Sequence, residues 1–344
     1  MRAGAFCRVA IVAGTAMLFS ASAGAQQVKK VGTSAAAFLR IPVGAKAVAM
    51  GSAFSSLADD GSALFWNPGA AARLEQRTFF VHHSPWLPGL DYTYLGFVFP
   101  AGRVGAVGIS VSSLRTAEMD VTTPEAPMGT GETFTAASTA IGVTFASSLT
   151  DRFSIGGSAK YVMERIFHSS AGGLAFDLGT LFQTPFRGIR FGVSVSNVGT
   201  KMQIRGEDLN TYVDVAPTQE GNNDEIVAEL KTDRFDLPII LRLGISWDLE
   251  IAPGTRLTLA ADGVNPNDNA HYVNVGAQLS ALKDMVFLWG GFNELFLPDR
   301  EKGPTAGAGV RLPSPGRTQV ALSYAYQDFR YLGPVNHFSI EIRF

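Results

Sequence analysis

The stretch LRLGISWD, residues 241–248, alternates in side-chain character with a period of two. One set of alternate positions is apolar and consists of Leu241, Leu243, Ile245 and Trp247. The other set is charged, polar or small and consists of Arg242, Gly244, Ser246 and Asp248. Because successive side chains of a β-strand point to opposite faces, this stretch is predicted to be a strand with one apolar and one polar face.

The same alternation recurs from about Arg77 to the end of the chain, for example in residues 106–113, 141–146 and 189–196. It predicts fourteen strands, each about eight to eleven residues long, that begin near residues 77, 91, 103, 136, 152, 173, 188, 239, 256, 270, 284, 304, 317 and 336. An even number of amphipathic strands of this length is typical of a bacterial outer-membrane barrel. The predicted fold class is an all-β membrane protein, a 14-stranded antiparallel transmembrane β-barrel.

The connections between these strands alternate in length. The short ones lie at residues 100–102, 149–151, 184–186, 251–254, 281–283 and 313–316, and the longer, polar ones include residues 115–135, 198–237, 293–302 and 328–336. Within the 198–237 loop, a short helix is predicted near residues 224–231. Outer-membrane barrels place their short turns on the periplasmic side. We therefore expect a location in the bacterial outer membrane, in contact with its lipid, with both barrel termini periplasmic.

A soluble sandwich or propeller would also alternate, so the membrane interpretation needs further support. Aromatic residues near strand ends would form the interfacial girdles of a membrane barrel: Tyr92, Tyr94, Phe99, Tyr161, Trp247, Phe292, Tyr324 and Tyr326. Charged residues in the strands fall on the face opposite the apolar set: Lys160, Asp177, Arg190, Arg242, Asp248, Asp262, Arg311, Glu341 and Arg343. On the lipid face a basic residue would cost about 2 to 4 kcal/mol at mid-depth.

The first residues have the form of a secretory signal peptide. Arg2 and Arg8 precede or flank an apolar run over residues 9–19, and small residues follow up to residue 25. The run is too short to span a bilayer, so residues 1–25 are predicted to be removed. The only cysteine, Cys7, lies in this segment. The remaining chain has 26 basic and 30 acidic residues, a net charge near −4, which argues against nucleic acid as a partner.

Residues 26–75 do not alternate and are rich in alanine and other small residues. A wide barrel needs filling, so this segment is predicted to form a partly helical hatch in the lumen, ahead of a barrel over residues 76–344. Asp59 and Asp60 are expected to precede and cap a hatch helix. Asn67 and Pro68 are expected to end that helix and turn the chain toward the first strand. Together with Trp66, these residues are the candidate gating residues, with structural or ligand-contacting roles.

Three glycines, Gly102, Gly105 and Gly108, lie at the start of the third predicted strand. Glycine in a strand often marks a kink or bulge rather than a phosphate-binding loop. A kink beside the hatch would open the barrel wall sideways, so these glycines are the candidates for a lateral opening.

No constellation of catalytic or metal-binding residues stands out. The histidines, His82, His83, His168, His271 and His337, are not at zinc-binding spacing, and the adjacent His82 and His83 would point to opposite faces of one strand. A nucleophile, a base and an orienting group are not recognisable as a set. We predict that the protein is not an enzyme and needs neither a metal nor another cofactor.

The segment IPVGAKAVAMGSAFSSLADDGSALFWNPGAAARL, residues 41–74, resembles the N-terminal signature of the PorV/PorQ family, a branch of the FadL-like outer-membrane barrels. In that family a hatch ending in an Asn-Pro-small motif precedes fourteen strands. Gly69 follows Asn67 and Pro68 here, where alanine is commoner. The resemblance implies an outer-membrane location and a lumen closed by the hatch, often with an opening in the wall beside it.

Two functions follow from this resemblance. The first is a component of the type IX secretion system that binds or shuttles secreted cargo proteins, with cargo or secretion-system subunits as partners. The alternative is a FadL-like channel for uptake or export of hydrophobic small molecules, with an apolar ligand that passes the hatch. A transporter requires a continuous apolar groove from the outer loops to the hatch, whereas a shuttle requires an opening shaped for a protein domain.

Overall fold

The computed structural model describes residues 31–344 except 187, 216–217, 219–224, 299 and 314–317. The predicted signal peptide, the first residues of the predicted hatch and most of the predicted turn at 313–316 lie outside the described residues. Fourteen strands form the barrel: β1 (Thr78–Leu87), β2 (Leu90–Pro100), β3 (Ala106–Thr116), β6 (Ala136–Ser148), β7 (Phe153–Ile166), β8 (Ser169–Gln183), β9 (Ile189–Gly199), β13 (Ile240–Ala252), β14 (Thr255–Pro266), β15 (Tyr272–Ala281), β16 (Val286–Leu295), β17 (Lys302–Pro313), β18 (Gln319–Phe329) and β19 (Gly333–Arg343).

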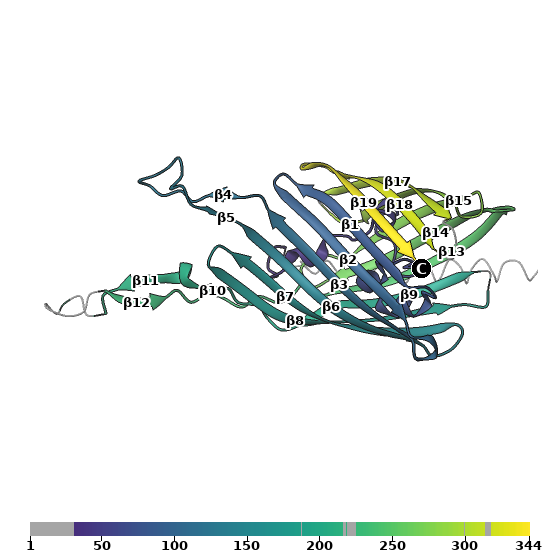
Figure 1. Ribbon diagram of the computed structural model, residues 1–344, viewed down its shortest axis with the longest axis horizontal. Coiled ribbons are helices and arrows are strands. Elements are labelled where there is room, and N and C mark those ends of the chain that lie inside the picture. The colour runs from purple at the N-terminus through teal and green to yellow at the C-terminus, as the bar shows by residue number, and fades with distance from the viewer. Residues whose placement is uncertain (1–30, 187, 216–217, 219–224, 299, 314–317) are drawn as a thin grey trace, which may run out of the picture.

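Every pairing between these strands is antiparallel, and the ring is closed by pairing of β1 with β19 and of β8 with β9 (Figure 1). The predicted 14-stranded antiparallel barrel is therefore confirmed. Each predicted strand corresponds to one observed strand, and its predicted start lies within four residues of the observed one. The backbone N–H of Phe344 donates to the carbonyl of Arg77 at 3.0 Å, so the C-terminus and the start of β1 share one end of the barrel.

The outer face of the barrel is an apolar belt. Side chains at alternate strand positions are exposed there, including Ile141, Val143, Phe145, Leu174, Leu178, Phe191, Leu243, Ile245, Phe338 and Ile340. The nine charged strand residues predicted on the opposite face all lie on the inner face. A closed barrel with an apolar exterior and a charged interior is the arrangement that suits surrounding lipid.

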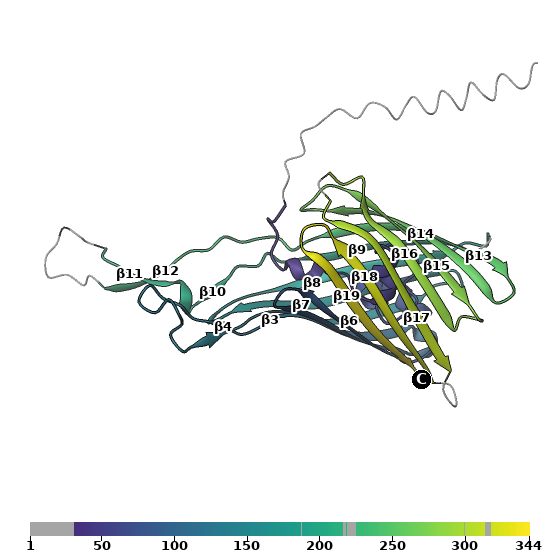
Figure 2. The same ribbon diagram turned by 90° about the horizontal axis from the view of Figure 1, so that it is seen from above.

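The two ends of the barrel differ. Short connections lie at the end that holds the C-terminus, here called the terminal end, and long connections lie at the opposite loop end (Figures 1 and 2). At the loop end two small hairpins extend past the barrel. One is formed by β4 (Met119–Asp120) and β5 (Thr133–Phe134), and the other by β11 (Asn210–Val213) and β12 (Ile226–Glu229). Strand β10 (Arg205–Gly206) pairs with β8, and a 3-10 turn, η5 (Glu207–Leu209), precedes β11.

The helix predicted near residues 224–231 is wrong, because β12 occupies this region. Ile226 and Val227 are β-branched and pair with Val213 and Tyr212. Among the described residues, no helix is long and apolar enough to cross a membrane.

Residues 34–75, here called the inner segment, lie within the ring of strands (Figure 2). They contain four short helices: η2 (Ala37–Arg40), α2 (Ala45–Ala49), α3 (Ala63–Trp66) and η3 (Pro68–Arg73). Helix α2 packs against β17 and β18, while η3 packs against β6, β7 and β8, so the segment spans the lumen from wall to wall.

The wall around β3 is continuous. A 3-10 turn, η4 (Gly102–Val104), places Gly102 before the strand, and Gly105 also precedes it. Strand β3 pairs with β2 and with β6 without a shift in register. The predicted kink in this strand is therefore wrong for this conformation. A lateral opening at Gly102, Gly105 and Gly108 remains a prediction.

A break in register lies instead between β8 and β9, where Asn197 adopts a left-handed backbone conformation with φ 65°. Its backbone N–H donates to Asp177 at 2.7 Å, and Asp177 also pairs with Lys160 at 2.7 Å. Asn197, the extra residue of this bulge, thus has its backbone N–H hydrogen-bonded to a side chain.

Candidate functional site

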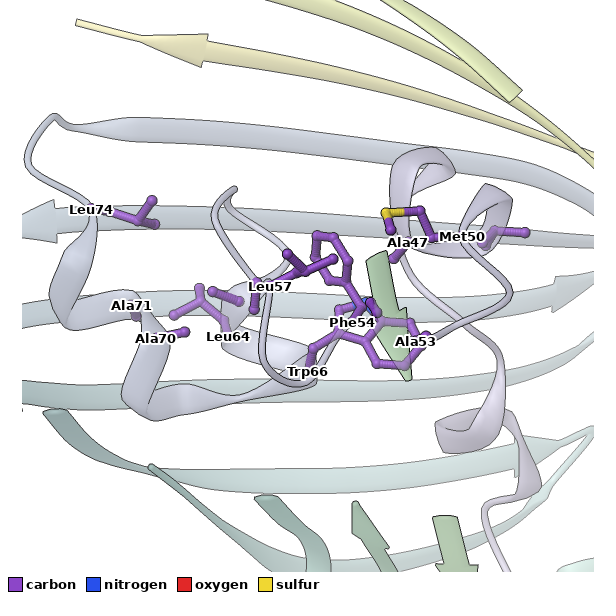
Figure 3. Packing of buried hydrophobic residues seen from close by; sticks show 14 of the residues in the cluster. Ala47, Met50, Ala53, Phe54, Leu57, Leu64, Trp66, Ala70, Ala71 and Leu74 are labelled. Atoms are coloured by element: carbon purple, nitrogen blue, oxygen red, sulfur yellow. The ribbon is translucent and has the colours of Figure 1, made fainter. Parts of the chain in front are cut away.

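The inner segment packs into the terminal half of the lumen through a buried apolar cluster. Phe54 and Trp66 meet edge to face, with ring centroids 6.1 Å apart, and Leu57 and Leu64 lie in the same cluster (Figure 3). The cluster continues into the barrel wall through Leu181, Phe287 and Trp289. Burial of this surface, rather than the length of any of its short helices, holds the segment in place.

Glycines on the inner face of the strands make room for the backbone of the inner segment. A Cβ at Gly179 would lie 2.2 Å from Oδ1 of Asn67, and a Cβ at Gly192 would lie 2.2 Å from the carbonyl oxygen of Ser55. A Cβ would also lie between 2.2 and 2.6 Å from an atom of the inner segment at five other glycines: Gly108, Gly156, Gly244, Gly276 and Gly307. Gly108, a predicted opening residue, thus accommodates Leu64. The shape of the inner wall matches the segment, so the two parts are complementary surfaces.

Asn67 joins both halves of the inner segment to the wall. Its Nδ2 donates to the carbonyl oxygens of Ser55 at 2.8 Å and Thr180 at 2.9 Å, and its Oδ1 accepts the N–H of Gly69 at 3.1 Å. It therefore ends α3 and also caps η3, which begins at Pro68. The prediction was that the chain turns toward β1 at Asn67 and Pro68. It does not do so directly, because the 3-10 helix η3 intervenes. Proline suits the first position of a helix, where its missing N–H has no partner to lose.

Trp66 is buried at the junction between the two ends of the segment. Its Nε1 donates to the carbonyl of Val43 at 2.7 Å, and the guanidinium of Arg242 lies 5.2 Å from its ring centroid. The indole thus has its polar group satisfied and its face against a cation, which is a stable arrangement for a buried tryptophan.

Asp59 and Asp60 lie at the terminal end of the lumen and have different partners. Asp59 forms an ion pair with Lys46 at 2.6 Å and does not cap a helix, contrary to the prediction. The carboxylate of Asp60 accepts the N–H of Ser62 at 2.9 Å, just before α3. Two residues of β19 also bond to this region: Glu341 accepts the N–H of Gly61, and Arg343 donates to the carbonyl of Asp59. We call Asp60, Glu341 and Arg343 together the latch.

The two carboxyl groups differ in proton affinity. Burial raises the pKa of Asp60 to about 7, and the negative charges of Glu341 and Asp59 add to this effect. The charge and hydrogen bond of Lys46, with Arg343 nearby, hold the pKa of Asp59, whose side chain is half exposed, well below its ordinary value. Asp60 therefore changes charge near neutral pH, while Asp59 stays ionised.

This difference predicts that docking of the inner segment weakens as pH rises. When the segment is released, the pKa of Asp60 returns to about 3.8, so the docked state binds more protons between that pH and about 7. The free energy of docking should fall over this window, by at most about 1.4 kcal/mol per pH unit, and change little above it. The rate of protease cleavage within residues 34–75, corrected for protease activity at each pH, measures this. Asp60→Asn should remove the dependence, and an unchanged slope in this variant would contradict the assignment.

Sequence reasoning placed Asp262 and Glu341 inside the barrel but missed what they do. Oδ2 of Asp262 accepts the N–H groups of Phe54 at 3.1 Å and Ser55 at 2.9 Å. Arg40, at the start of the segment, pairs with Asp268 at 2.9 Å in the loop between β14 and β15. A carboxylate on the inner face of a strand is the signal that could have identified such anchors, because unpaired helix-turn amides in a lumen need acceptors.

The loop half of the lumen contains a second buried apolar cluster. Phe38, Leu39, Ile41 and Val43 of the inner segment share one buried cluster with wall and loop residues, here called the loop-end cluster: Phe80, Tyr92, Tyr94, Ala140, Val162, Ala171, Ala175, Met202 and Leu237. Tyr92 and Tyr94 are thus buried inside the barrel, and their predicted place in a lipid-facing girdle is wrong. On β2 both faces carry apolar side chains, so alternation alone did not distinguish the lumen from the lipid side.

The terminal end holds a cavity of about 550 Å³ between the inner segment and the wall. Four arginines, Arg73, Arg190, Arg311 and Arg343, line it together with Asp59 and Glu75. No group of three or more residues able to hold a metal ion occurs among the residues that the structure describes.

Comparisons with known proteins agree with the fold. A sequence profile of the uncharacterised protein family UPF0164 matches residues 9–175. No curated protein matches the chain. The PorV/PorQ resemblance of residues 41–74 is tested by none of these matches and stays a prediction.

Among solved structures, the CymD monoaromatic hydrocarbon channel is similar over 88% of this chain and 96% of its own, with 13% identity and a TM-score of 0.52. The Ralstonia pickettii toluene transporter TbuX is similar over 87% of this chain and 97% of its own, with 12% identity and a TM-score of 0.53. The Pseudomonas putida toluene transporter TodX is similar over 87% of this chain and 96% of its own, with 12% identity and a TM-score of 0.51. At these identities the likeness concerns the fold, which is a closed antiparallel barrel shared with membrane channels.

Proposed function

We propose that the protein is an outer-membrane channel for hydrophobic small molecules. In this proposal residues 1–25 are a signal peptide, residues 26–75 are a hatch and residues 76–344 are the barrel. Both barrel termini face the periplasm, because the terminal end carries the short connections. The apolar belt contacts outer-membrane lipid.

The apolar loop-end cluster is the observation that carries this proposal. Water-filled porins have polar interiors, whereas here aromatic and aliphatic wall residues face the lumen and contact Phe38 and Leu39 of the same chain. A wall with this chemistry suits an apolar ligand that takes the place of these side chains. The similar folds of channels named for toluene and monoaromatic hydrocarbons favour the same function.

The route that we propose begins at the loop end. A ligand displaces residues 36–43, which hold their place through the apolar cluster and through Arg40 and Asp268. It then passes the hatch when the latch formed by Asp60, Glu341 and Arg343 releases, or leaves sideways through the wall. Asp59, Asp60, Trp66, Asn67 and Pro68 act in this scheme as the residues that keep the hatch closed.

Uptake of radiolabelled toluene by cells that lack other channels for hydrocarbons tests the proposal. Expression of the protein should raise the initial uptake rate several-fold. Ala175→Trp, which fills the apolar lumen, should abolish this increase, whereas Leu174→Trp, on the outer face of the same strand, should not. Equal uptake with and without the protein would contradict the proposal. Co-purification of secreted proteins that share one C-terminal domain would instead support the cargo shuttle of the type IX secretion system.

A further inference from the structure

A group of buried polar side chains lies in the lumen wall beside the loop-end cluster. His82 on β1, His337 on β19 and Gln327 on β18 each have no exposed surface. The two imidazole rings stack, with centroids 5.4 Å apart and planes inclined by 14°. His337 and Gln327 are diagonal neighbours across the β18–β19 ladder, in which Gln327 pairs with Val335 and Ala325 pairs with His337. We call these three residues the polar triad.

Most polar atoms of the triad have no hydrogen-bond partner in the protein. Five atoms make no hydrogen bond: both ring nitrogens of His337, both polar side-chain atoms of Gln327 and Nε2 of His82. An unsatisfied buried donor or acceptor costs about 1 to 3 kcal/mol, and native proteins seldom keep several together. Five such atoms within one patch indicate that this patch has a partner in a working state of the protein.

The surroundings of the triad suit an aromatic ligand. Trp86 lies edge to face with His337 at 6.0 Å and with Phe329 at 5.3 Å, and Tyr92 lies edge to face with His82 at 6.2 Å. Rings at these angles form a box that accepts the edge or face of another ring. The triad is thus polar at its centre and aromatic around it.

The chemistry of the triad favours a neutral polar group. A neutral imidazole and a primary amide each offer one or more donors and an acceptor, which matches a hydroxyl group that both donates and accepts. None of the ion pairs in the described part of the chain includes a triad residue. A carboxylate would lose its hydration here without gaining a cation, which is costly.

The triad is linked to the inner segment through Ser339. Nδ1 of His82 lies 3.1 Å from Oγ of Ser339, and the same oxygen accepts the N–H of Ala45, the first residue of α2, at 2.8 Å. A ligand that lies in the triad therefore contacts the His82 ring, which is one hydrogen bond away from Ser339, the residue that anchors α2.

We infer that the polar triad is a specificity site for neutral aromatic molecules that bear a hydroxyl group, such as phenols. This inference rests on the proposed function and specifies its ligand class. The aromatic body lies against Trp86, Tyr92 and Phe329, while the hydroxyl bonds to His337 and Gln327. The site becomes accessible when residues 36–43 withdraw.

Binding of p-cresol and toluene to the purified protein in detergent tests this, because the two molecules differ by one hydroxyl group. Dissociation constants from calorimetry are corrected for the partition of each molecule into empty micelles. The wild type should prefer p-cresol by about tenfold or more, as expected for one or two added hydrogen bonds in a buried site. His337→Phe and Gln327→Leu should reduce the preference to about twofold or less and leave toluene affinity nearly unchanged.

His83→Phe is the matched control, because His83 lies next to His82 on the exposed face of β1. It should retain the preference. The mobility of unheated and boiled samples on a denaturing gel shows whether each variant forms a barrel. Equal corrected affinities for p-cresol and toluene in the wild type would overturn the inference and leave the channel function standing. Tighter binding of p-toluate than of p-cresol would overturn the neutral ligand class, and binding of none of the three would count against the proposed function itself.

Discussion

Replacing Gly179 with leucine is expected to leave the barrel folded but permanently open. A Cβ at this position would lie 2.2 Å from Oδ1 of Asn67 and 2.8 Å from Cδ of Pro68, so a side chain cannot fit while the inner segment is docked. The hatch has little freedom to adjust here, because Asn67 is fixed by three hydrogen bonds to backbone groups. Strand β8, which contains Gly179, is expected to keep its conformation, because its ladder with β7 is regular.

Single-channel recording in planar bilayers measures the effect. The wild type should show few or no openings, whereas Gly179→Leu should show stable open currents. Gly290→Leu is the control, because a Cβ at Gly290 meets nothing within 4 Å. Gel mobility of the unheated variants reports whether the barrel has formed. Closed traces from a folded Gly179→Leu protein would show that the hatch accommodates the side chain, and that it does not block the lumen in the way described.

Truncating Phe38 and Leu39 to alanine together is expected to tighten the binding of toluene by about a hundredfold or more. Both side chains are buried in the loop-end cluster, where the proposed ligand also binds. Each truncation removes about 2 to 5 kcal/mol of packing from the docked segment. A ligand that competes with the segment gains what the segment loses, and about 1.4 kcal/mol corresponds to a factor of ten in affinity.

Titration calorimetry on the purified double variant checks this result. Leu57→Ala is the control, since Leu57 is also buried in the inner segment but belongs to the other apolar cluster, in the terminal half of the lumen, with Phe54 and Trp66. This variant should weaken the docking of the inner segment against the wall without changing toluene affinity appreciably. If Phe38→Ala with Leu39→Ala lowers the affinity for toluene instead, then these side chains form part of the ligand site rather than competing for it.

The sequence predicted the barrel well because period-two alternation is a local property. Within each strand, such as residues 241–248, the alternation of apolar and polar side chains shows which residues share a face. The lengths of the connections then predict the antiparallel order without any knowledge of distant contacts. The same reasoning failed at Tyr92 and Tyr94, which face an apolar lumen. Alternation tells which residues share a face, but not which of two apolar faces meets lipid.

The candidate site was less accessible to sequence reasoning. The sequence singled out Asp59 and Asn67 as candidate gating residues, which stays a prediction. It did not identify their partners Lys46, Ser55 and Thr180, which are between 12 and 113 residues away along the chain. The triad of His82, Gln327 and His337 went unnoticed, because its members lie on three strands from the two ends of the barrel sequence. Ring closure between β1 and β19 brings them together.

The sequence by itself therefore determined the class of fold, the number of strands and the residues that share a strand face. Only the tertiary structure decided which inner glycines contact the inner segment, how Asp59 and Asp60 come to differ in proton affinity, and which polar groups are left without partners in the lumen. The physical reason is range. Strand alternation and turn chemistry act between neighbours in the chain, whereas packing, desolvation and hydrogen bonding inside a closed barrel depend on residues that meet only after the ring has closed.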